Sequence, residues 1–352
     1  MVIVDEPVRG GLFKPEMLGL SGREQMQAGI DGYGVYPPMH HLTGMRPTEI
    51  GEGTSTFTMP STGWLATHYG VITGGILAAL ADGPLGCSIQ STLGPGTIYT
   101  TSELSMSYLR PAYPDGRTIT AKGRVIHAGR SLALSEAMVT DADGRELAHC
   151  TSRCFVFPPA DTPLPRPELT PYEPPDYGSP DPYLREPVGA ILGDDVDGLP
   201  GIEHWRGCMN GTLPPPPLYY LTGSRPVEVG EGTVTWRMPA SPWLCSPTGF
   251  VEGGLLVYLA DAACASATDT LTDAGTAAAP IDITVKFIRP VPPDNRDLTA
   301  VGRVVNHGRS ISVASAEIRN ADGKLVATAL GSSMLLPGRS LAKPVVVQDE
   351  QA

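Results

Sequence analysis

The sequence predicts an α+β protein made of two copies of one domain, each an antiparallel sheet wrapped around one long buried helix. Three observations support this fold class. The chain repeats itself, each copy holds one long segment that is apolar on nearly all sides, and several runs of strand-like sequence follow that segment. A helix without a polar face must be covered all round, so a sheet has to curve around it.

The repeat is the main organisational feature of the chain. Residues 20–158 align without a gap on residues 199–337, at a constant offset of 179. A period this long indicates duplicated whole domains, because solenoid repeats span only about 20–50 residues. The proline-rich segment between the copies is a linker that either lies over the surface as a strap or forms a free tether. The expected parts are an N-terminal extension, domain 1, the linker, domain 2 and a C-terminal tail, at 1–19, 20–158, 159–198, 199–337 and 338–352.

Within the first copy the elements follow in a readable order. Residues 52–58 suggest a strand, and the segment 70–92, rich in Ala, Leu and Gly, is typical of a buried helix. In the next run Leu104, Met106 and Tyr108 alternate with polar residues, which is the period of a half-buried strand. Three further strands joined by hairpin turns are expected near 117–127, 131–141 and 145–157.

Composition and charge argue against several classes of function. The 25 Lys and Arg against 37 Asp and Glu give a net charge of −12, which disfavours nucleic acid or an anionic membrane as a partner. The longest apolar stretch, 71–81, is too short to span a bilayer, and the N-terminus does not resemble a secretory signal. The six cysteines and seven histidines show no metal-ligand spacing, so we expect no metal, and reduced thiols in a cytoplasmic protein.

One aspartate lies inside each helical segment. Asp82 is in 70–92, and Asp261 has the matching position in 249–271, the helical segment of the second copy. Aspartate is a poor residue for the middle of a helix and costly to bury, so its presence in both copies favours a role in a reaction. The alternative is a structural aspartate that is bonded to a backbone group or to a tyrosine.

A glycine pair begins each helical segment. Gly74 and Gly75 in the first copy match Gly253 and Gly254 in the second. Each glycine costs about 1 kcal/mol relative to alanine inside a helix, so the pair needs a compensating role. First-turn amides are unpaired and lie at the positive end of the helix dipole, where they can bind a ligand carbonyl. The alternative is tight packing of the helix start against the sheet.

The spacing of these features predicts where they meet. Gly74 and Asp82 are eight residues apart, about 12 Å along a helix, which is too far for both to act on one carbonyl. If the two helices pack side by side and antiparallel, each aspartate lies beside the glycines of the other copy. Two composite sites follow: Asp261 with Gly74 and Gly75, and Asp82 with Gly253 and Gly254.

Each copy resembles a hotdog-fold acyl-CoA thioesterase of the PaaI type. That family reads N-P-x-G-x-x-H-G-G followed by a helix with L-x-D, and this chain has related sequences at 67–75 with 80–82, and at 246–254 with 259–261. Residues 108–111 and 287–290 are similar to the F-x-R-P of the family. The resemblance implies two hotdog domains that join their sheet edges, align their central helices antiparallel and share sites at the interface.

The same resemblance implies a reaction. A thioester would be hydrolysed while a glycine amide polarises its carbonyl, and the aspartate would act either as nucleophile or as general base for water. Coenzyme A would enter as part of the substrate, without a separate cofactor. Four arginines are candidates for binding its phosphates, with ordinary surface ion pairing as the alternative for each: Arg110, Arg289, Arg130 and Arg309.

The chain departs from the family before each glycine pair. The family histidine is replaced by Thr73 in the first copy and by Glu252 in the second. Glu252 would place a negative charge near a developing oxyanion, whereas Thr73 is neutral and its hydroxyl could help. The alternatives are a simple N-cap for Thr73 and a favourable interaction with the helix dipole for Glu252.

These departures predict that the two sites are unequal. Gly83 and Pro84 follow Asp82 and are expected to loosen the helix there, whereas the helix continues after Asp261. Both defects fall on the Asp82 site, so the Asp261 site should be the working one.

Two further expectations concern function and assembly. The alternative function is an acyl-CoA binding or sensing protein that kept the fold and lost turnover, which the replacements at 73 and 252 suggest. The hydratase string D-x-N-P-x-H is absent, which disfavours hydration of enoyl thioesters. Hotdog units commonly stack, so the two-domain chain is expected to self-associate.

Overall fold

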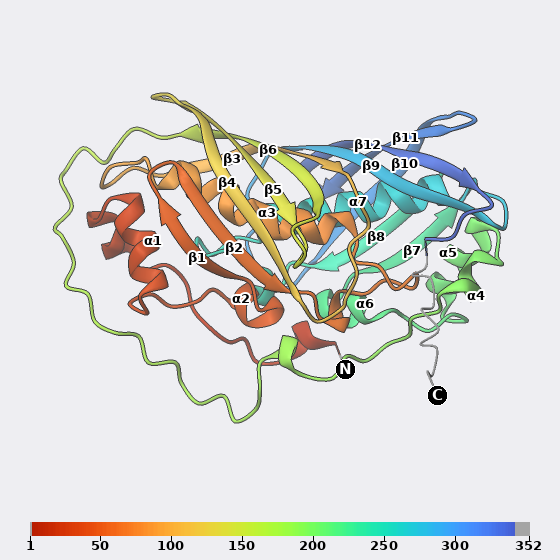
Figure 1. The fold of residues 1–352 in the computed structure, drawn as a ribbon, viewed down its shortest axis with the longest axis horizontal. Helices are drawn as coiled ribbons and strands as arrows, with labels where there is room; N and C mark the ends of the chain where they lie inside the picture. Colours follow the sequence, from red (N-terminus) through yellow and green to blue (C-terminus); the bar gives the residue numbers. More distant parts are fainter. Residues whose placement is uncertain (1, 342–352) are drawn as a thin grey trace.

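The structure is a computed structural model that describes residues 2–341, and its strands form one continuous antiparallel sheet of twelve (Figure 1). Each repeat contributes six strands, in the order β1-β2-β4-β5-β6-β3 and then β9-β12-β11-β10-β8-β7. The first six are β1 (Arg46–Gly51), β2 (Thr54–Pro60), β3 (Tyr99–Tyr108), β4 (Thr118–Ala128), β5 (Leu132–Thr140) and β6 (Glu146–Val156). The second six are β7 (Arg225–Gly230), β8 (Thr233–Pro239), β9 (Thr276–Phe287), β10 (Asp297–His307), β11 (Ile311–Arg319) and β12 (Leu325–Pro337).

The two half-sheets join where β3 pairs with β9. The pairing is antiparallel and runs from Glu103 opposite Lys286 to Ser107 opposite Asp282. Since β3 and β9 are equivalent strands of the two repeats, the junction lies on the pseudo-twofold axis of the molecule. The α+β class and the double hotdog arrangement expected from the sequence are therefore confirmed.

One long helix per repeat lies against the sheet, α3 (Gly74–Gln90) in the first and α7 (Gly253–Asp269) in the second (Figure 1). Both are a few residues shorter at each end than the predicted segments. The expected loosening after Asp82 is wrong, because α3 continues through Pro84 to the same length as α7. Proline costs about 3 kcal/mol inside a helix. The burial of α3 on several sides offsets that cost, with Leu80, Leu85 and Ile89 fully inaccessible.

The helices α3 and α7 pack side by side and antiparallel. A Cβ added at Gly75 would lie 2.4 Å from the Cα of Tyr258, and one at Gly254 would lie 2.4 Å from the Cα of Ala79. From Gly75 to Ala79 the residue number rises along α3, while the contacted residue on α7 changes from Tyr258 to Gly254. The two helices therefore run in opposite directions. The second glycine of each pair thus permits close contact with the partner helix, rather than with the sheet.

The sequence missed the edge strands and the short helices around the core. The predicted strand 52–58 corresponds to β2. The edge strand β1 was not predicted, because Pro47 and the register shift next to it interrupt the alternation of apolar and polar residues. The other helices are α1 (Gly22–Ile30), α2 (Pro38–Thr43), α4 (Asp194–Asp197), α5 (Gly201–Asn210) and α6 (Pro217–Thr222). Single 3-10 turns are η1 (Ile3–Asp5), η2 (Pro15–Gly19), η3 (Gly63–Leu65), η4 (Pro182–Leu184) and η5 (Pro242–Leu244).

The linker between the repeats is held to the surface at several points, which favours the strap over the free tether (Figure 1). Asp181 forms an ion pair with Arg9 of the N-terminal extension at 3.0 Å. The indole of Trp64 donates a hydrogen bond to the carbonyl of Arg185 at 2.9 Å. The domain boundaries remain a prediction, and residues 342–352 of the expected tail lie outside the described residues.

Candidate active site

Asp261 lies in the middle of α7, yet its carboxylate binds groups of the first repeat. Its Oδ2 accepts hydrogen bonds from the Gly75 amide at 3.0 Å and from the Thr73 hydroxyl at 2.9 Å. The Tyr108 hydroxyl donates to Oδ1 at 3.4 Å. The aspartate is 3% exposed, while Thr73 and Gly74 are half-buried. The composite arrangement that the spacing predicts is thus present, and we call it the Asp261 site.

Thr73 precedes the first residue of α3, at the N-cap position. Its hydroxyl makes no capping hydrogen bond to the helix and instead points to Asp261. The simple capping alternative therefore does not describe this residue. The first amide of α3, at Gly74, has no partner within the helix because of its position.

Asp82 occupies the equivalent position in α3, and we call its surroundings the Asp82 site. Its Oδ2 accepts a hydrogen bond from the Gly254 amide at 2.9 Å, and Gly253 lies next to the same oxygen. The offset of 179 puts Glu252 in place of Thr73 and Phe287 in place of Tyr108. Phe287 has no polar group, and Glu252 has a carboxyl group where Thr73 has a hydroxyl.

Burial raises the pKa of both aspartates, but the two sites oppose this rise differently. At Asp261 the rise is opposed by hydrogen bonds from Thr73, Gly75 and Tyr108. At Asp82, where the Gly254 amide alone opposes it, burial raises the pKa to about 6. Hydrogen-bond donors stabilise a carboxylate over the neutral acid, so the Asp261 site is better built for an ionised aspartate.

Glu252 adds a second buried carboxyl group to the Asp82 site. Burial, together with the charge of Asp82, raises its pKa well above the ordinary glutamate value. The Asp82 site therefore contains two buried carboxyl groups whose pKa values are both raised.

We expect Glu252→Gln to stabilise the protein at high pH. A raised pKa means that the folded state holds the proton more tightly than the unfolded chain does. The resulting stability is present below the unfolded value of about 4.5 and is lost as pH rises through the raised pKa. Glutamine has no charge to bury, so the gain in unfolding free energy should be larger at pH 8 than at pH 5, by about 1 kcal/mol or more.

Urea unfolding of wild type and variant at the two pH values measures this difference. Glu231→Gln, at an exposed position, is the matched control and should show the same small change at both. A gain for Glu252→Gln that does not depend on pH would contradict the expectation.

The four arginines proposed for phosphate binding are all exposed and lie along the two rims of the sheet, where the strands end. Arg110 follows the end of β3, and Arg309 lies in the turn between β10 and β11. The end of β3 pairs with the first half of β9. The beginning of β9 pairs with the end of β12, which also pairs with the beginning of β11. Arg110 and Arg309 therefore lie on the same rim of the sheet. By the equivalent pairings, Arg289 and Arg130 share the other rim.

Each rim belongs to one aspartate site. The Arg110 rim is that of the Asp261 site, because β3 ends at Tyr108, which contacts Asp261. The Arg289 rim is that of the Asp82 site, because β9 ends at Phe287 beside Gly253. The sequence did not reveal that each pair combines one arginine from each repeat.

Tyr108 is a site residue that sequence reasoning missed. In the sequence it stands out only as part of the F-x-R-P resemblance and as a strand residue. The alignment of the two repeats could have indicated its role, because Tyr108 of the first copy aligns with Phe287 of the second. A hydroxyl that one copy has and the other lacks marks the same asymmetry as Thr73 and Glu252.

Comparison with known families decides the kind of domain. The family model described as Thioesterase superfamily matches the chain twice, over residues 69–148 and 248–327. The chain is a tandem hotdog protein in which each repeat matches the Thioesterase superfamily model. Both aspartates and both glycine pairs lie inside the matched ranges. The catalytic roles of these residues remain a prediction.

Solved structures share the double hotdog fold at low identity. A tesB protein from Mycobacterium avium subs paratuberculosis has a TM-score of 0.54 and 16% identity, covering 85% of this chain and 98% of its own. The acyl-CoA thioesterase II TesB2 from Mycobacterium marinum has a TM-score of 0.51 and 13% identity, with the same two coverages. At such identities the likeness shows the fold alone.

The PaaI type expected from the sequence finds less support than the broader family does. The E. coli PaaI protein has a TM-score of 0.35 and 20% identity and covers 40% of this tandem hotdog chain. A likeness of that size carries no argument, and the two TesB proteins span both repeats. A search of the curated proteins finds no match. Among residues 2–341, none of the helices has the length and apolar character to cross a bilayer.

Proposed function

We propose that the protein hydrolyses an acyl-CoA thioester to a free acid and coenzyme A, chiefly at the Asp261 site. One observation carries this proposal: a buried carboxylate of the second repeat accepts hydrogen bonds from a first-turn amide, at Gly75, and from the Thr73 hydroxyl at the start of a helix of the first repeat. This places a base or nucleophile beside donors aimed at developing negative charge, the combination that acyl transfer requires. The family match supports a thioester substrate, and the acyl-CoA thioesterase II from Mycobacterium marinum, which shares the fold, supports coenzyme A as its carrier.

The N-terminus of α3 would bind the thioester carbonyl. The amide of Gly74 has no partner within the helix and points where the helix dipole favours negative charge. Glycine has no Cβ at this position, which allows the Tyr108 ring to lie close to the start of the helix. The half-buried Thr73 and Gly74 form the more accessible side of the site, while Asp261 lies behind them.

Asp261 would then act in one of two ways. As general base it removes a proton from water, whose oxygen attacks the carbonyl carbon and expels the coenzyme A thiolate. As nucleophile it attacks the carbon itself, the C–S bond breaks to release the coenzyme A thiolate, and water then hydrolyses the mixed anhydride to the free acid and the aspartate. Both routes need the ionised carboxylate, which the hydrogen bonds from Thr73, Gly75 and Tyr108 favour.

Thiol release from a panel of acyl-CoA substrates tests the proposal. We expect turnover of at least one member that scales with enzyme concentration. Binding of an acyl-CoA at micromolar concentration without any thiol release would contradict hydrolysis and favour the alternative, a binding or sensing protein.

We expect the two rims to differ in their effect on substrate binding. Replacing Arg110 and Arg309 together by alanine should raise KM for the best acyl-CoA several-fold and leave kcat largely unchanged, because both lie on the rim of the Asp261 site. The matched variant with Arg289 and Arg130 replaced should change KM little. Steady-state kinetics at low ionic strength measures this contrast, since salt screens exposed charges. Equal KM values in wild type and both variants would remove these arginines from substrate binding.

We further infer that the enzyme acts in the cytoplasm and that the chain self-associates. The six cysteines are free in the structure, which fits a reducing compartment. Analytical ultracentrifugation of the full chain would test self-association.

A further inference from the structure

Two histidines and a cysteine meet at a place that the proposed reaction does not use. His204 and Cys208 lie one turn apart on α5, and His68 comes from the segment that leads into α3. His68 Nδ1 lies 3.1 Å from His204 Nε2 and 3.6 Å from Cys208 Sγ. The three atoms all lie within 4.8 Å of one another. His68 is 3% exposed and His204 is 1% exposed, while Cys208 is half-buried.

We propose that these three side chains bind one Zn²⁺ ion. Tetrahedral zinc has bonds of about 2.0–2.1 Å to histidine nitrogen and about 2.3 Å to cysteine sulfur. These bonds set two nitrogens about 3.3 Å apart and a nitrogen and a sulfur about 3.6 Å apart. The two separations from His68 Nδ1, 3.1 Å and 3.6 Å, fit such an ion. The third, between His204 Nε2 and Cys208 Sγ, is within 4.8 Å, and an ion would draw these two atoms to about 3.6 Å. A set of two imidazoles and one thiolate suits zinc rather than magnesium or calcium.

The partner of the second His68 nitrogen fixes which atom faces the cluster. His68 Nε2 lies 2.7 Å from the carbonyl oxygen of Pro214. A carbonyl only accepts hydrogen bonds, so Nε2 carries the proton, and Nδ1 of the neutral ring turns its lone pair toward the other two ligands. A carbonyl on the far nitrogen is a usual outer partner of a zinc-bound histidine.

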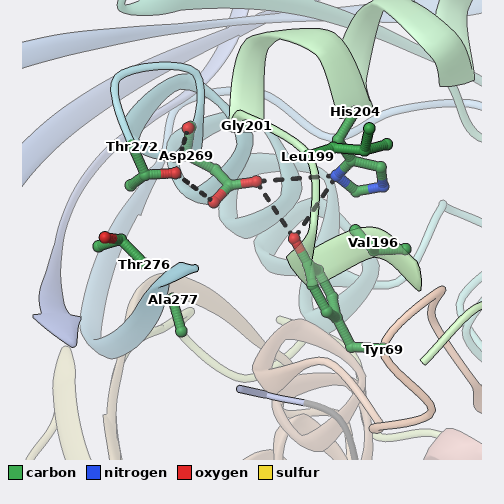
Figure 2. Close-up of a pocket in the computed structure, with 9 residues that line it drawn as sticks. All are labelled: Tyr69, Val196, Leu199, Gly201, His204, Asp269, Thr272, Thr276 and Ala277. Carbon is green, nitrogen blue, oxygen red and sulfur yellow. Dashed lines mark hydrogen bonds and ion pairs between the residues drawn. The ribbon is translucent and has the colours of Figure 1, made fainter. Parts of the chain in front are cut away.

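His204 has an outer partner of the same kind. Its Nδ1 faces the Asp269 carboxylate at 3.8 Å and the Tyr69 hydroxyl at 3.5 Å (Figure 2). Tyr69 and the indole of Trp205 both donate to Asp269 Oδ2, at 3.3 Å and 2.8 Å, and hold that carboxylate in place. A proton on Nδ1, facing these two oxygens, would leave Nε2 free for a metal.

Within residues 2–341 the cluster has no counterpart at the equivalent positions of the other repeat. At the offset of 179, the positions equivalent to His68, His204 and Cys208 hold Pro247, Gln25 and Gly29, none of which supplies an imidazole or a thiolate. The three ligands are therefore not a by-product of the shared fold. A bound ion would tie the segment that carries Thr73 to helix α5 of the second repeat.

Metal analysis of the full-length protein tests the proposal. After loading with Zn²⁺ and gel filtration, we expect about one zinc per chain in wild type and a loss of zinc affinity of at least 10-fold in Cys208→Ser and His204→Gln. Cys154→Ser is the matched control, because hydroxyls of Thr101 and Ser152 already surround that thiol at 3.8 Å and 3.7 Å. It should bind zinc like wild type.

Cobalt gives a second measurement that requires no folded variant. Co²⁺ bound in place of zinc should show a thiolate-to-cobalt charge-transfer band in the wild-type protein, and zinc should slow alkylation of Cys208 but not of the other cysteines. Substoichiometric zinc, or equal zinc affinity in wild type and Cys208→Ser, would overturn the proposal. The cluster would then be a hydrogen-bonded histidine pair in which His204 Nε2 donates to His68 Nδ1. None of these readouts depends on thioesterase activity.

Discussion

Asp261→Asn is expected to lower kcat on the best acyl-CoA by about 10²–10⁴-fold, the range that a lost general base or nucleophile costs, whereas Asp82→Asn should leave most of the activity. Asparagine keeps the shape of aspartate but cannot carry the charge that both routes require. Asp261 has donors from Thr73, Gly75 and Tyr108, while Asp82 has the Gly254 amide and lies near a buried glutamate.

Steady-state kinetics of the two variants measures the contrast, and circular dichroism checks that each is folded. The aspartates occupy equivalent positions on equivalent helices, so each variant is the matched control of the other. Equal losses, or a larger loss in Asp82→Asn, would refute the inequality of the sites.

Gly74→Ala should lower kcat about 10²-fold or more, the usual effect of losing an oxyanion donor. Alanine keeps the main-chain amide, but its Cβ would lie 2.3 Å from Cζ of Tyr108, so the start of the helix and the tyrosine ring that contacts Asp261 cannot both keep their places. Gly253→Ala is the matched control. Its Cβ would lie 3.5 Å from Cζ of Phe287 and 3.0 Å from an Asp82 oxygen, and its site is expected to contribute little turnover.

Kinetics and thermal unfolding together separate the two roles of the glycine pair. Gly75→Ala should lose stability as well as activity, because its Cβ would lie 2.4 Å from the main chain of Tyr258 on the partner helix. Wild-type turnover in a folded protein with both Gly74 and Gly75 replaced would remove these amides from the mechanism.

The sequence predicted the parts of the site that rest on spacing. Gly74 and Asp82 lie too far apart along one helix to act together, which was enough to require an antiparallel partner helix. The composite pairs of aspartate and glycine amide followed from that alone, and the structure has both. The repeat supplied the rest of the fold, because duplicated domains with matching buried helices pair around a pseudo-twofold axis.

Other features depend on contacts that no local pattern encodes. Pro84 stays within α3 because the surrounding sheet and the partner helix bury the helix on several sides. Tyr108 reaches Asp261 only after the strand β3 has been placed at the junction between repeats. The histidine cluster joins residues 136 positions apart, although the spacing of His204 and Cys208 on one helix was a signal that could have been noticed.

The junction of β3 and β9 has a consequence for how the two sites could change over time. In a dimer of identical hotdog chains, every substitution appears in both sites at once, so neither can weaken without the other. Here the continuous sheet joins two repeats of one chain, and each position mutates alone. Thr73 could be kept in one copy while Glu252 took its place in the other. If the two sites are unequal as predicted, joining the copies is what allowed one of them to lose the need to function while the other kept it.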